Sequence, residues 1–355
     1  MSNILINYAN SIFKVTDELL STDKVALLGQ GVDDFKGLWG TTLGLKNKFP
    51  DKVYDTPLSE EAIAGICLGM SLNGLYPINT HIRADFSLLM FNQLINMGAK
   101  YKYMFGGLFG MPSLFRLVIG RSWGQGAQHS QSFQSMLGHI PGLRVFMPAT
   151  SFDIFNCYRY SYSKLDCPVV IFEHRLLYDI NFECEQKIID HKEMYVEPTT
   201  KIERYGTDIT IVATSIMVVE SLRVAETFHN LGIEIEVINS LDITFPKMEC
   251  IFESVKKTGL LIVADTSWLN YGVGSEILAR LSEQGISLLA PPKRLGMQFS
   301  PCPTSHVLEE YFYSGYYEIY NTVFQLMKIK SPMLSVPEIS KVSTVQMYKK
   351  FKGPF

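Results

Sequence analysis

Short apolar segments of strand length alternate with longer amphipathic segments along most of this chain. The first half has apolar strand candidates at 24–29, 75–82, 113–119, 143–147 and 168–173. Helical periodicity marks 10–20, 60–75, 87–103 and 151–164 between them. Strands that alternate with helices of about 10–15 residues are typical of a mostly parallel sheet with helices on both faces. The first half is therefore predicted to be an α/β domain.

A second, smaller α/β pattern follows a polar stretch that lacks a clear period. Its strand candidates lie at 208–213, 234–238 and 260–264, with helices at 218–231 and 274–284. We therefore predict domains at 1–180 and 206–330, a linker at 181–205, and an extended tail at 331–355.

The composition excludes several functional classes. Lys and Arg number 32 against 35 Asp and Glu, so the net charge is −3, and no basic tract offers a footprint for nucleic acid or a membrane surface. No segment approaches the roughly 18 apolar residues of a membrane span. The first residues lack the basic start and apolar core of a signal peptide, and we expect a cytoplasmic protein. The six cysteines form no C-x-x-C pair, so no metal site is expected in this chain.

Polar residues that could carry chemistry gather in three segments of the first domain. DTPLSEEAIAG at 55–65 puts Glu60 at a helix start, where an acid also suits the helix dipole. GRSWGQGAQHSQ at 120–131 places His129 after a glycine-rich loop at a strand end, where open α/β sheets bind ligands. His81, Arg83 and Asp85 share one face of a strand end, which is also typical of a solvated edge. A structural and a functional interpretation remain open for each segment.

The order of motifs resembles the β subunits of thiamine-diphosphate-dependent 2-oxo acid dehydrogenases of the transketolase-like superfamily. In the first domain the resemblance rests on GLWGTTLGL, DTPLSE, NQLINMGAKYKYMFGG, QHSQS, PGLRVFMP and CPVVIFE. In the second it rests on GTDITIVA, IFESVKKTG and YGVGSEI. It implies two α/β domains, a pyrimidine-binding domain and a transketolase C-terminal-like domain, each with a mostly parallel sheet flanked by helices.

The same resemblance implies roles for single residues. Glu60 matches the glutamate that hydrogen-bonds the aminopyrimidine ring of thiamine diphosphate, and Phe86 matches the aromatic residue that stacks on this ring. Gln30 lies at a position near the cofactor where the family usually has an acid. His129 matches a histidine that faces the reacting carbon. The resemblance thus predicts Glu60 and His129 as catalytic residues, and Glu60, Phe86 and Gln30 as cofactor-binding residues.

The diphosphate half of such a site is missing from this chain. The family holds the diphosphate through Mg²⁺ with a G-D-G motif and a later Asn pair, and this sequence has neither G-D-G nor N-N. An anion of this charge needs a metal or a cluster of donors. The resemblance therefore implies an α subunit that holds the diphosphate and Mg²⁺, an α₂β₂ heterotetramer with a β–β contact, and no activity of the isolated chain.

Several residues depart from the family pattern near the expected site. Besides Gln30, these are His81, Arg83, Arg121 and Trp123, and we predict that His81, Arg83, Arg121 and Gln128 contact the substrate. Two reactions remain open. Decarboxylation of a 2-oxo acid passes the acyl group either to a lipoyl carrier or to an aldehyde or ketone such as a sugar. A third alternative is a non-catalytic β-like scaffold.

Overall fold

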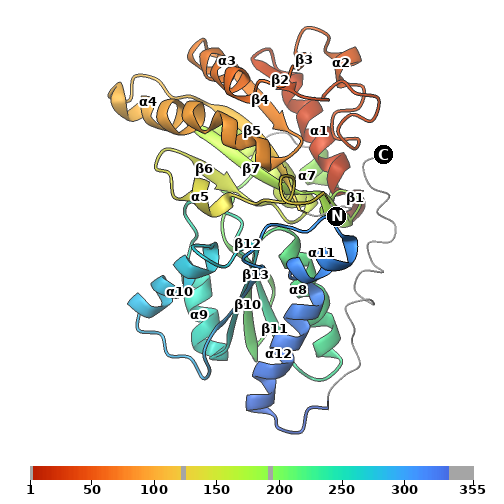
Figure 1. The fold of residues 1–355 in the computed structure, drawn as a ribbon, viewed down its shortest axis with the longest axis vertical. Coiled ribbons are helices and arrows are strands. Elements are labelled where there is room, and N and C mark those ends of the chain that lie inside the picture. The colour runs from red at the N-terminus through yellow and green to blue at the C-terminus, as the bar shows by residue number, and fades with distance from the viewer. Residues whose placement is uncertain (1–2, 121–124, 191–194, 336–355) are drawn as a thin grey trace. The chain divides into compact units, whose positions relative to one another are not determined.

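The computed structural model of this chain describes residues 3–120, 125–190 and 195–335. The fold comprises two compact units (Figure 1). Of the described residues, the first unit holds 3–120, 129–190 and 195–198, and the second holds 125–128 and 199–335. The expected arrangement of two α/β domains with mostly parallel sheets is confirmed.

A six-stranded parallel sheet forms the centre of the first unit, as far as the chain is described. Its strands run in the order β3-β2-β4-β5-β7-β6. Their bounds are β2 Val25–Gly29, β3 Val53–Asp55, β4 Tyr76–His81, β5 Ser113–Ile119, β6 Arg144–Phe146 and β7 Pro168–His174. The four inner strands are buried along their whole length, which is typical of a parallel sheet covered on both faces.

Helices cover both faces of this sheet (Figure 1). The first-unit helices are α1 Tyr8–Leu20, α2 Leu45–Lys48, α3 Glu60–Leu72, α4 Ala99–Met104, α5 Gln134–Gly138, α6 Ser151–Lys164 and α7 Gln186–Asp190. The α3 helix leads from β3 to β4 and α6 leads back from β6 to β7, so the two connections run in opposite directions along the sheet. Because such crossovers are right-handed, α3 and α6 lie on opposite faces, and α1 packs beside α6.

The single long helix predicted over 87–103 is not formed, and residues 84–104 are divided differently. The segment is divided into a 3₁₀ helix at Ala84–Met90 (η1), a π-helix at Asn92–Gly98 (η2) and α4. All three kinds of turn place residues three to five apart on one face, so a pattern of apolar residues does not distinguish them. A π-helix is rare and often marks a functional segment.

The polar segment after residue 180 begins with regular structure. Asn181–Glu185 forms β8, which pairs antiparallel with β1 at Asn3–Asn7, and α7 follows directly. The two strands are far apart in sequence, and neither has a clear alternating pattern. Arg159 of α6 holds this region: its Nη1 donates to the carbonyl of Ile188, and its Nη2 donates to Glu18 at 2.7 Å.

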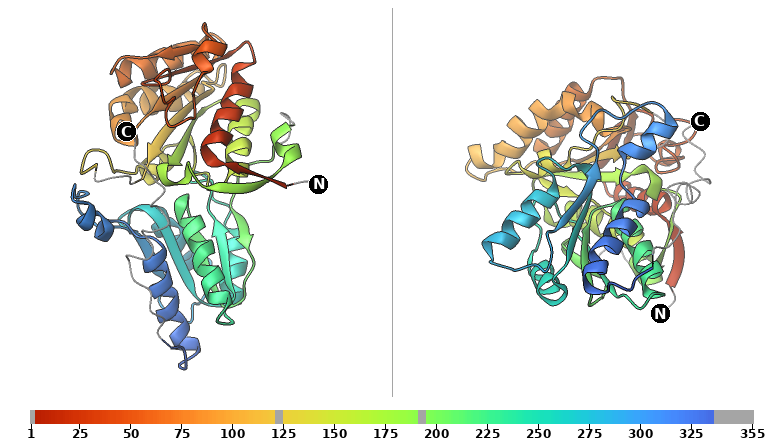
Figure 2. Two further views of the ribbon diagram at one scale, coloured as in Figure 1. Left: turned by 90° about the vertical axis from the view of Figure 1, so that its right-hand side faces the viewer. Right: turned by 60° about the horizontal axis from the view of Figure 1, so that its bottom comes forward.

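The second unit contains a five-stranded sheet in the order β13-β12-β10-β11-β9, counted over the described residues. Its strands are β9 Lys201–Arg204, β10 Ile209–Ala213, β11 Ile235–Asn239, β12 Leu261–Trp268 and β13 Lys293–Met297. Its helices are α8 Ile216–His229, α9 Glu249–Thr258, α10 Val273–Glu283, α11 His306–Phe312 and α12 Tyr316–Lys330. All pairs are parallel except β11 with β9. Figures 1 and 2 show α8 and α12 side by side on one face, with α9 and α10 on the other.

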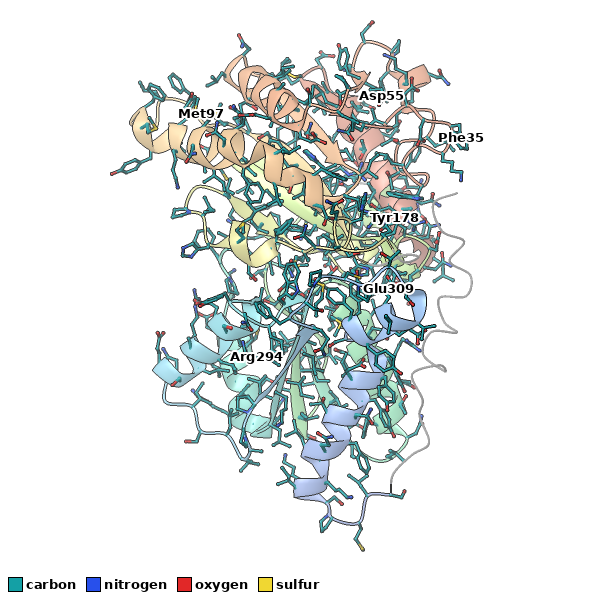
Figure 3. All side chains as sticks on the ribbon, viewed as in Figure 1. Phe35, Asp55, Met97, Tyr178, Arg294 and Glu309 are labelled. Atoms are coloured by element: carbon teal, nitrogen blue, oxygen red, sulfur yellow. The ribbon has the colours of Figure 1, made fainter. Side chains whose placement is uncertain are left out.

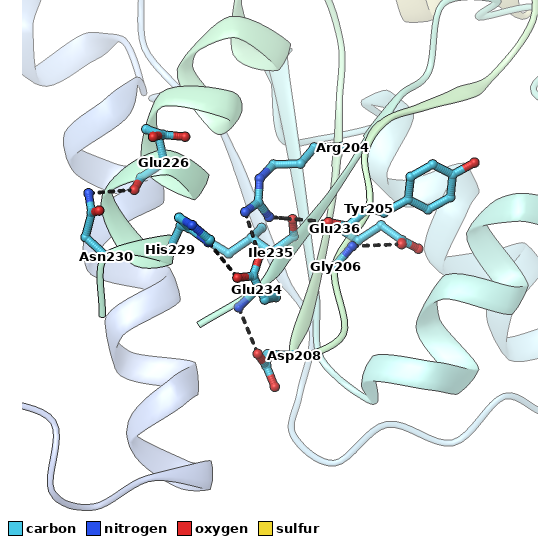
Figure 4. A network of polar contacts seen from close by, with 10 residues as sticks. All are labelled: Arg204, Tyr205, Gly206, Asp208, Glu226, His229, Asn230, Glu234, Ile235 and Glu236. Atoms are coloured by element: carbon cyan, nitrogen blue, oxygen red, sulfur yellow. Dashed lines mark hydrogen bonds and ion pairs between the residues drawn. The ribbon is translucent and has the colours of Figure 1, made fainter. Parts of the chain in front are cut away.

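A polar network fixes the edge strand β9 against β11 (Figure 4). Arg204 donates from Nη2 to Glu234 and from Nη1 to the carbonyl of Ile235, each at 2.6 Å. His229 at the end of α8 lies 2.6 Å from the other oxygen of Glu234. Arg204 and His229 together lower the pKa of the Glu234 carboxyl. The network holds β9 over the edge of β11, and β9 is the outer strand at this end of the described sheet.

A buried ion pair lies inside the first unit. Arg116 of β5 donates to both carboxylate oxygens of Glu173 on β7, at 2.9 and 3.0 Å, and both side chains have no exposed surface. The hydroxyls of Tyr158 and Tyr178 also donate to Glu173. Figure 3 labels Tyr178 within this packed interior. Because a buried charge is costly unless it is paired and bonded, these four residues depend on each other.

The described ranges hold neither a membrane-spanning helix nor a cluster of metal-binding side chains. No helix there is long and apolar enough to cross a membrane. Over the same ranges, no group of three His, Cys, Asp or Glu side chains is arranged to hold a metal ion.

Candidate functional site

The carboxyl ends of β2 and β4 meet where the strand order of the first sheet reverses. From β2 the chain goes to β3 on one side, and then returns past β2 to β4 on the other. Such a reversal leaves a crevice outside the strand ends, and this is the ligand-binding place of open α/β sheets. Gly29 ends β2 there, and its missing side chain matters: a Cβ would lie 2.5 Å from the carbonyl oxygen of Thr80.

Glu60 and Gln30 are joined at this edge. Gln30 Nε2 donates a hydrogen bond of 2.9 Å to Glu60 Oε1. Glu60 is 7% exposed, whereas the next residue, Glu61, is exposed. Ser59 makes no side-chain capping bond to the helix. The interpretation of this segment as a simple helix start therefore does not account for the buried Glu60 side chain.

Asp55 fixes the loop that carries Gln30. Its Oδ1 accepts a hydrogen bond of 2.7 Å from the backbone N–H of Gly31. Figure 3 labels Asp55 at this end of the first unit. Sequence reasoning did not single out Asp55 as a site residue, although it is the first residue of DTPLSE. The sequence feature that could have indicated Asp55 is its position at a strand end, directly after the last apolar side chains.

His81 is the last residue of β4 and lies near Glu60. Burial lowers the pKa of its imidazole to about 4, and the charge of Glu60 acts in the opposite direction. The ring is therefore neutral at physiological pH. Its Nε2 is buried and has no hydrogen-bond partner in the described part of the chain. A buried polar atom of this kind is expected to meet a ligand or a water.

Arg83 is turned toward the backbone of a neighbouring strand end. It is 2% exposed, and its Nη1 donates a hydrogen bond of 3.0 Å to the carbonyl of Gly120. Asp85, on the same segment, accepts two hydrogen bonds from Gln131. His81, Arg83 and Asp85 are thus all buried, and the alternative of a solvated strand edge is wrong.

Phe86 and His129 form an aromatic pair. Their ring centroids lie 5.3 Å apart with planes at 81°, an edge-to-face arrangement. Phe86 is 39% exposed, so part of its ring surface stays open in spite of this contact. Gln128 lies in the exposed turn just before His129. Arg121 and Trp123 lie outside the described residues.

The residues of this edge fit one half of thiamine diphosphate. A buried carboxylate, an aromatic ring with exposed surface and an unpartnered imidazole nitrogen suit a flat heterocycle with ring nitrogens. They do not suit a diphosphate, which needs several donors or a metal, because the Arg83 guanidinium bonds a backbone carbonyl and no metal-binding group occurs among the described residues. The donor set therefore matches the aminopyrimidine ring alone.

Comparisons with known proteins agree with this geometry. Residues 6–180 match the family described as Transketolase, pyrimidine binding domain, and residues 199–315 match Transketolase, C-terminal domain. The mitochondrial pyruvate dehydrogenase E1 component subunit beta of Bos taurus is 39% identical over 297 residues, which cover 83% of this chain and 82% of the relative. The human protein of that name is 38% identical over the same length and shares.

The similarity to a solved structure supports the fold and nothing beyond it. The chain of a split gene transketolase, described as an inactive beta4 tetramer, superposes with a TM-score of 0.71 at 20% sequence identity. The match covers 92% of this chain and 99% of that one. It confirms the transketolase-like fold of both units.

The expectation of a cytoplasmic protein is wrong. The animal and plant relatives are named as mitochondrial proteins, among them those of Bos taurus, Homo sapiens and Pisum sativum. The absence of an evident secretion signal, on which the expectation was based, does not bear on mitochondrial import. The family matches, the identity to the E1 beta subunits and the pyrimidine-type site converge on one conclusion. The chain belongs to the E1 beta subunits of the thiamine-diphosphate-dependent 2-oxo acid dehydrogenases, within the transketolase-like superfamily.

Proposed function

We propose that this chain supplies the aminopyrimidine half of a thiamine diphosphate site that decarboxylates a 2-oxo acid. The observation that carries the proposal is the buried Glu60 carboxylate, oriented by Gln30 at the strand-order reversal. Bound there, thiamine diphosphate supplies a carbon nucleophile and a place for the electrons left when CO₂ departs. Glu60 would share a proton with the ring nitrogen, and Phe86 would pack on the ring face.

His129 and His81 have different tasks in this proposal. His129 is half-buried and paired with Phe86, so it would lie beside a ring that packs on Phe86 and could give or take a proton there. His81 is neutral, so it would donate or accept a hydrogen bond and not pair with a substrate carboxylate. Arg83, Arg121 and Gln128 remain predicted substrate contacts. The Arg83 bond to Gly120 supports a role in holding the strand end that carries the glycine loop.

A partner subunit has to complete the site. We propose that an α subunit holds the diphosphate and Mg²⁺ and that the assembly is α₂β₂ with a β–β contact. The relatives are named as the beta subunits of an E1 component, which supports a multisubunit enzyme. Their names also support a mitochondrial location. Purification of the tagged chain from mitochondria of its own cells, with mass spectrometry of bound proteins, should recover an α-like chain. Recovery of self-associated chain alone would contradict the proposal.

The acyl acceptor is proposed to be a lipoyl group on a carrier protein, since the relatives are pyruvate dehydrogenase E1 subunits. The runner-up is transfer to an aldehyde or ketone, which the buried polar residue His81 beside Glu60 favours because it can bond a polar acceptor. The purified complex should be given a 2-oxo acid with either a lipoyl domain or an aldehyde. Acylation of the lipoyl domain supports the first reaction, and a new hydroxyketone supports the second.

The role of Glu60 is tested in the same complex with a matched control. Glu60→Ala should lower the decarboxylation rate by about 100-fold or more, because general acid–base groups contribute about that much. Glu61→Ala changes the neighbouring acid on the exposed side of the same helix turn and should stay within about twofold of wild type. Both should assemble normally in gel filtration. Wild-type decarboxylation by Glu60→Ala would favour a scaffold that does not act in catalysis.

A further inference from the structure

Asp85 is hydrogen-bonded to Gln131, a residue 46 positions away in the chain. It lies in the first turn of η1, directly before Phe86. Its Oδ1 accepts a hydrogen bond of 3.1 Å from the backbone N–H of Gln131 and another of 3.0 Å from Gln131 Nε2. We call this pair of bonds the Asp85–Gln131 clamp. One carboxylate oxygen thereby holds both the backbone and the side chain of one residue.

The clamp is adjacent to the aromatic pair of the candidate site. Phe86 follows Asp85, and His129 precedes Gln131 by two residues. The edge-to-face contact of Phe86 and His129 and the clamp therefore join the same two segments at neighbouring positions. Residues 129–133 have no helix or strand of their own to hold them. A contact between two rings alone contributes about 1 kcal/mol, which is weak for fixing a loop.

The burial of Asp85 makes its hydrogen bonds to Gln131 important for the stability of the clamp. The side chain is 6% exposed. Burial raises the pKa of its carboxyl, and the two bonds from Gln131 and the nearby charge of Arg83 offset only part of that rise. A buried carboxylate is costly unless its hydrogen bonds are made, so the bonds from Gln131 stabilise Asp85 in this position.

We infer that Asp85 is a positioning residue that holds His129 against Phe86 through Gln131. This inference deepens the proposed function, since it assigns the device that places the proposed proton-transfer histidine. Asp85 itself bonds Gln131, so it acts on the site through that residue. Without the clamp, the 129–133 segment would move relative to η1, and the imidazole of His129 would lose its fixed place.

Substitutions at position 85 that keep or remove the hydrogen-bond acceptor test the inference. Asp85→Asn keeps an oxygen in the place of Oδ1 and can still accept both bonds, whereas Asp85→Ala removes the acceptor. Gln131→Met removes the side-chain donor of a half-buried residue and keeps the backbone bond to Asp85. This variant tests the clamp even if Asp85→Ala does not fold. The first readout is the nuclear Overhauser contact between the rings of Phe86 and His129, in full-length chain labelled at Phe and His.

We expect the ring contact in wild type and in Asp85→Asn, its loss in Asp85→Ala, and its weakening in Gln131→Met. In the purified complex, kcat for decarboxylation should fall about 10- to 100-fold in Asp85→Ala with KM little changed, because misplacement of a group costs about that much. Asp85→Asn should recover most of the rate.

Two results would overturn the inference. One is an intact ring contact in both Asp85→Ala and Gln131→Met, and the other is an equal loss in Asp85→Asn and Asp85→Ala, since the negative charge would then be the cause. A third result separates the inference from the proposed function. Loss of the ring contact in Asp85→Ala, together with an unchanged rate in both Asp85→Ala and His129→Ala, would support the clamp and overturn the catalytic role of His129.

Discussion

The amide of Gln30 donates a hydrogen bond of 2.9 Å to the carboxylate of Glu60 at the carboxyl ends of β2 and β4. The resemblance to the E1 beta subunits places an acid at position 30 in most of the family. An amide can donate to a carboxylate, and a second ionised carboxylate cannot. In this chain the partner of Glu60 is therefore a neutral donor, and the pair needs no shared proton.

Gln30→Glu should change the proton binding of this site. The new carboxylate would face Glu60 where the Gln30 amide nitrogen now lies 2.9 Å from its oxygen. Two carboxylates in such close contact cannot both be ionised, so the pair would hold a proton to a higher pH than either acid alone. The acidic limb of the pH profile of kcat/KM should move upward by about one pH unit or more in the purified complex. The measurement is the decarboxylation rate between pH 5 and pH 9.

Gln30→Met is the control for that shift. It removes the donor without adding a charge, so the rate should fall and the acidic limb should move less than in Gln30→Glu. An acidic limb that is identical in wild type and Gln30→Glu would show that residue 30 does not share a proton with Glu60.

The stability of the protein should depend on pH through His81. Its pKa is lowered from 6.5 to about 4 in the folded chain. Between these two values the unfolded chain binds the proton more strongly, so the free energy of unfolding decreases as the pH falls from about 6.5 toward 4. A shift of this size corresponds to a loss of about 3 kcal/mol at the acid end. Urea unfolding at a series of pH values measures it.

His81→Phe should remove that share of the pH dependence, because Phe does not titrate and fills a similar volume. The variant should also be at least as stable as wild type at pH 7, since the unpartnered Nε2 is lost. Equal pH slopes in the two proteins would mean that the imidazole of His81 is not kept neutral by burial.

Gly120 should be far less tolerant of a side chain than another glycine with a similar backbone. It has φ +90°, and a Cβ there would lie 2.3 Å from Nε2 of His174. Gly74 has φ +82° and open space around the Cβ position. Gly120→Ala and Gly74→Ala therefore share the backbone strain, and only the first adds a clash. Gly120→Ala should cost about 1–3 kcal/mol more in urea unfolding. Equal losses would contradict the packing of His174 on Gly120.

Arg116→Met should destabilise the first unit strongly. It leaves the fully buried carboxylate of Glu173 with hydroxyl donors and no cation, a change that costs about 3–5 kcal/mol in comparable pairs. The double variant Arg116→Met with Glu173→Leu should recover part of this loss, because no buried charge remains. Urea unfolding of the full chain measures both. A double variant less stable than Arg116→Met would mean that Glu173 contributes mainly through its tyrosine partners.

The periodic elements of the fold could be predicted because their causes are local. The core strands of both sheets and α6 lie close to the predicted segments, since a buried strand needs an apolar run and a helix needs its repeat. β1 and β8 were missed because each is stabilised by the other, with Ile4 opposite Cys184, and not by its own pattern. The division of residues 84–104 was missed because it depends on hydrogen-bond offsets that apolar spacing does not record.

The sequence by itself determined the family and the residue types of the candidate site, since motif order and the residues Glu60, Phe86 and His129 are properties of the chain alone. The tertiary structure decided which of these side chains meet. The bonds from Gln30 to Glu60, from Arg83 to Gly120 and from Gln131 to Asp85 join residues 30 or more positions apart. Such bonds depend on which strand ends lie side by side, and strand order is a property of the whole sheet. The same packing buries His81, and burial sets its charge.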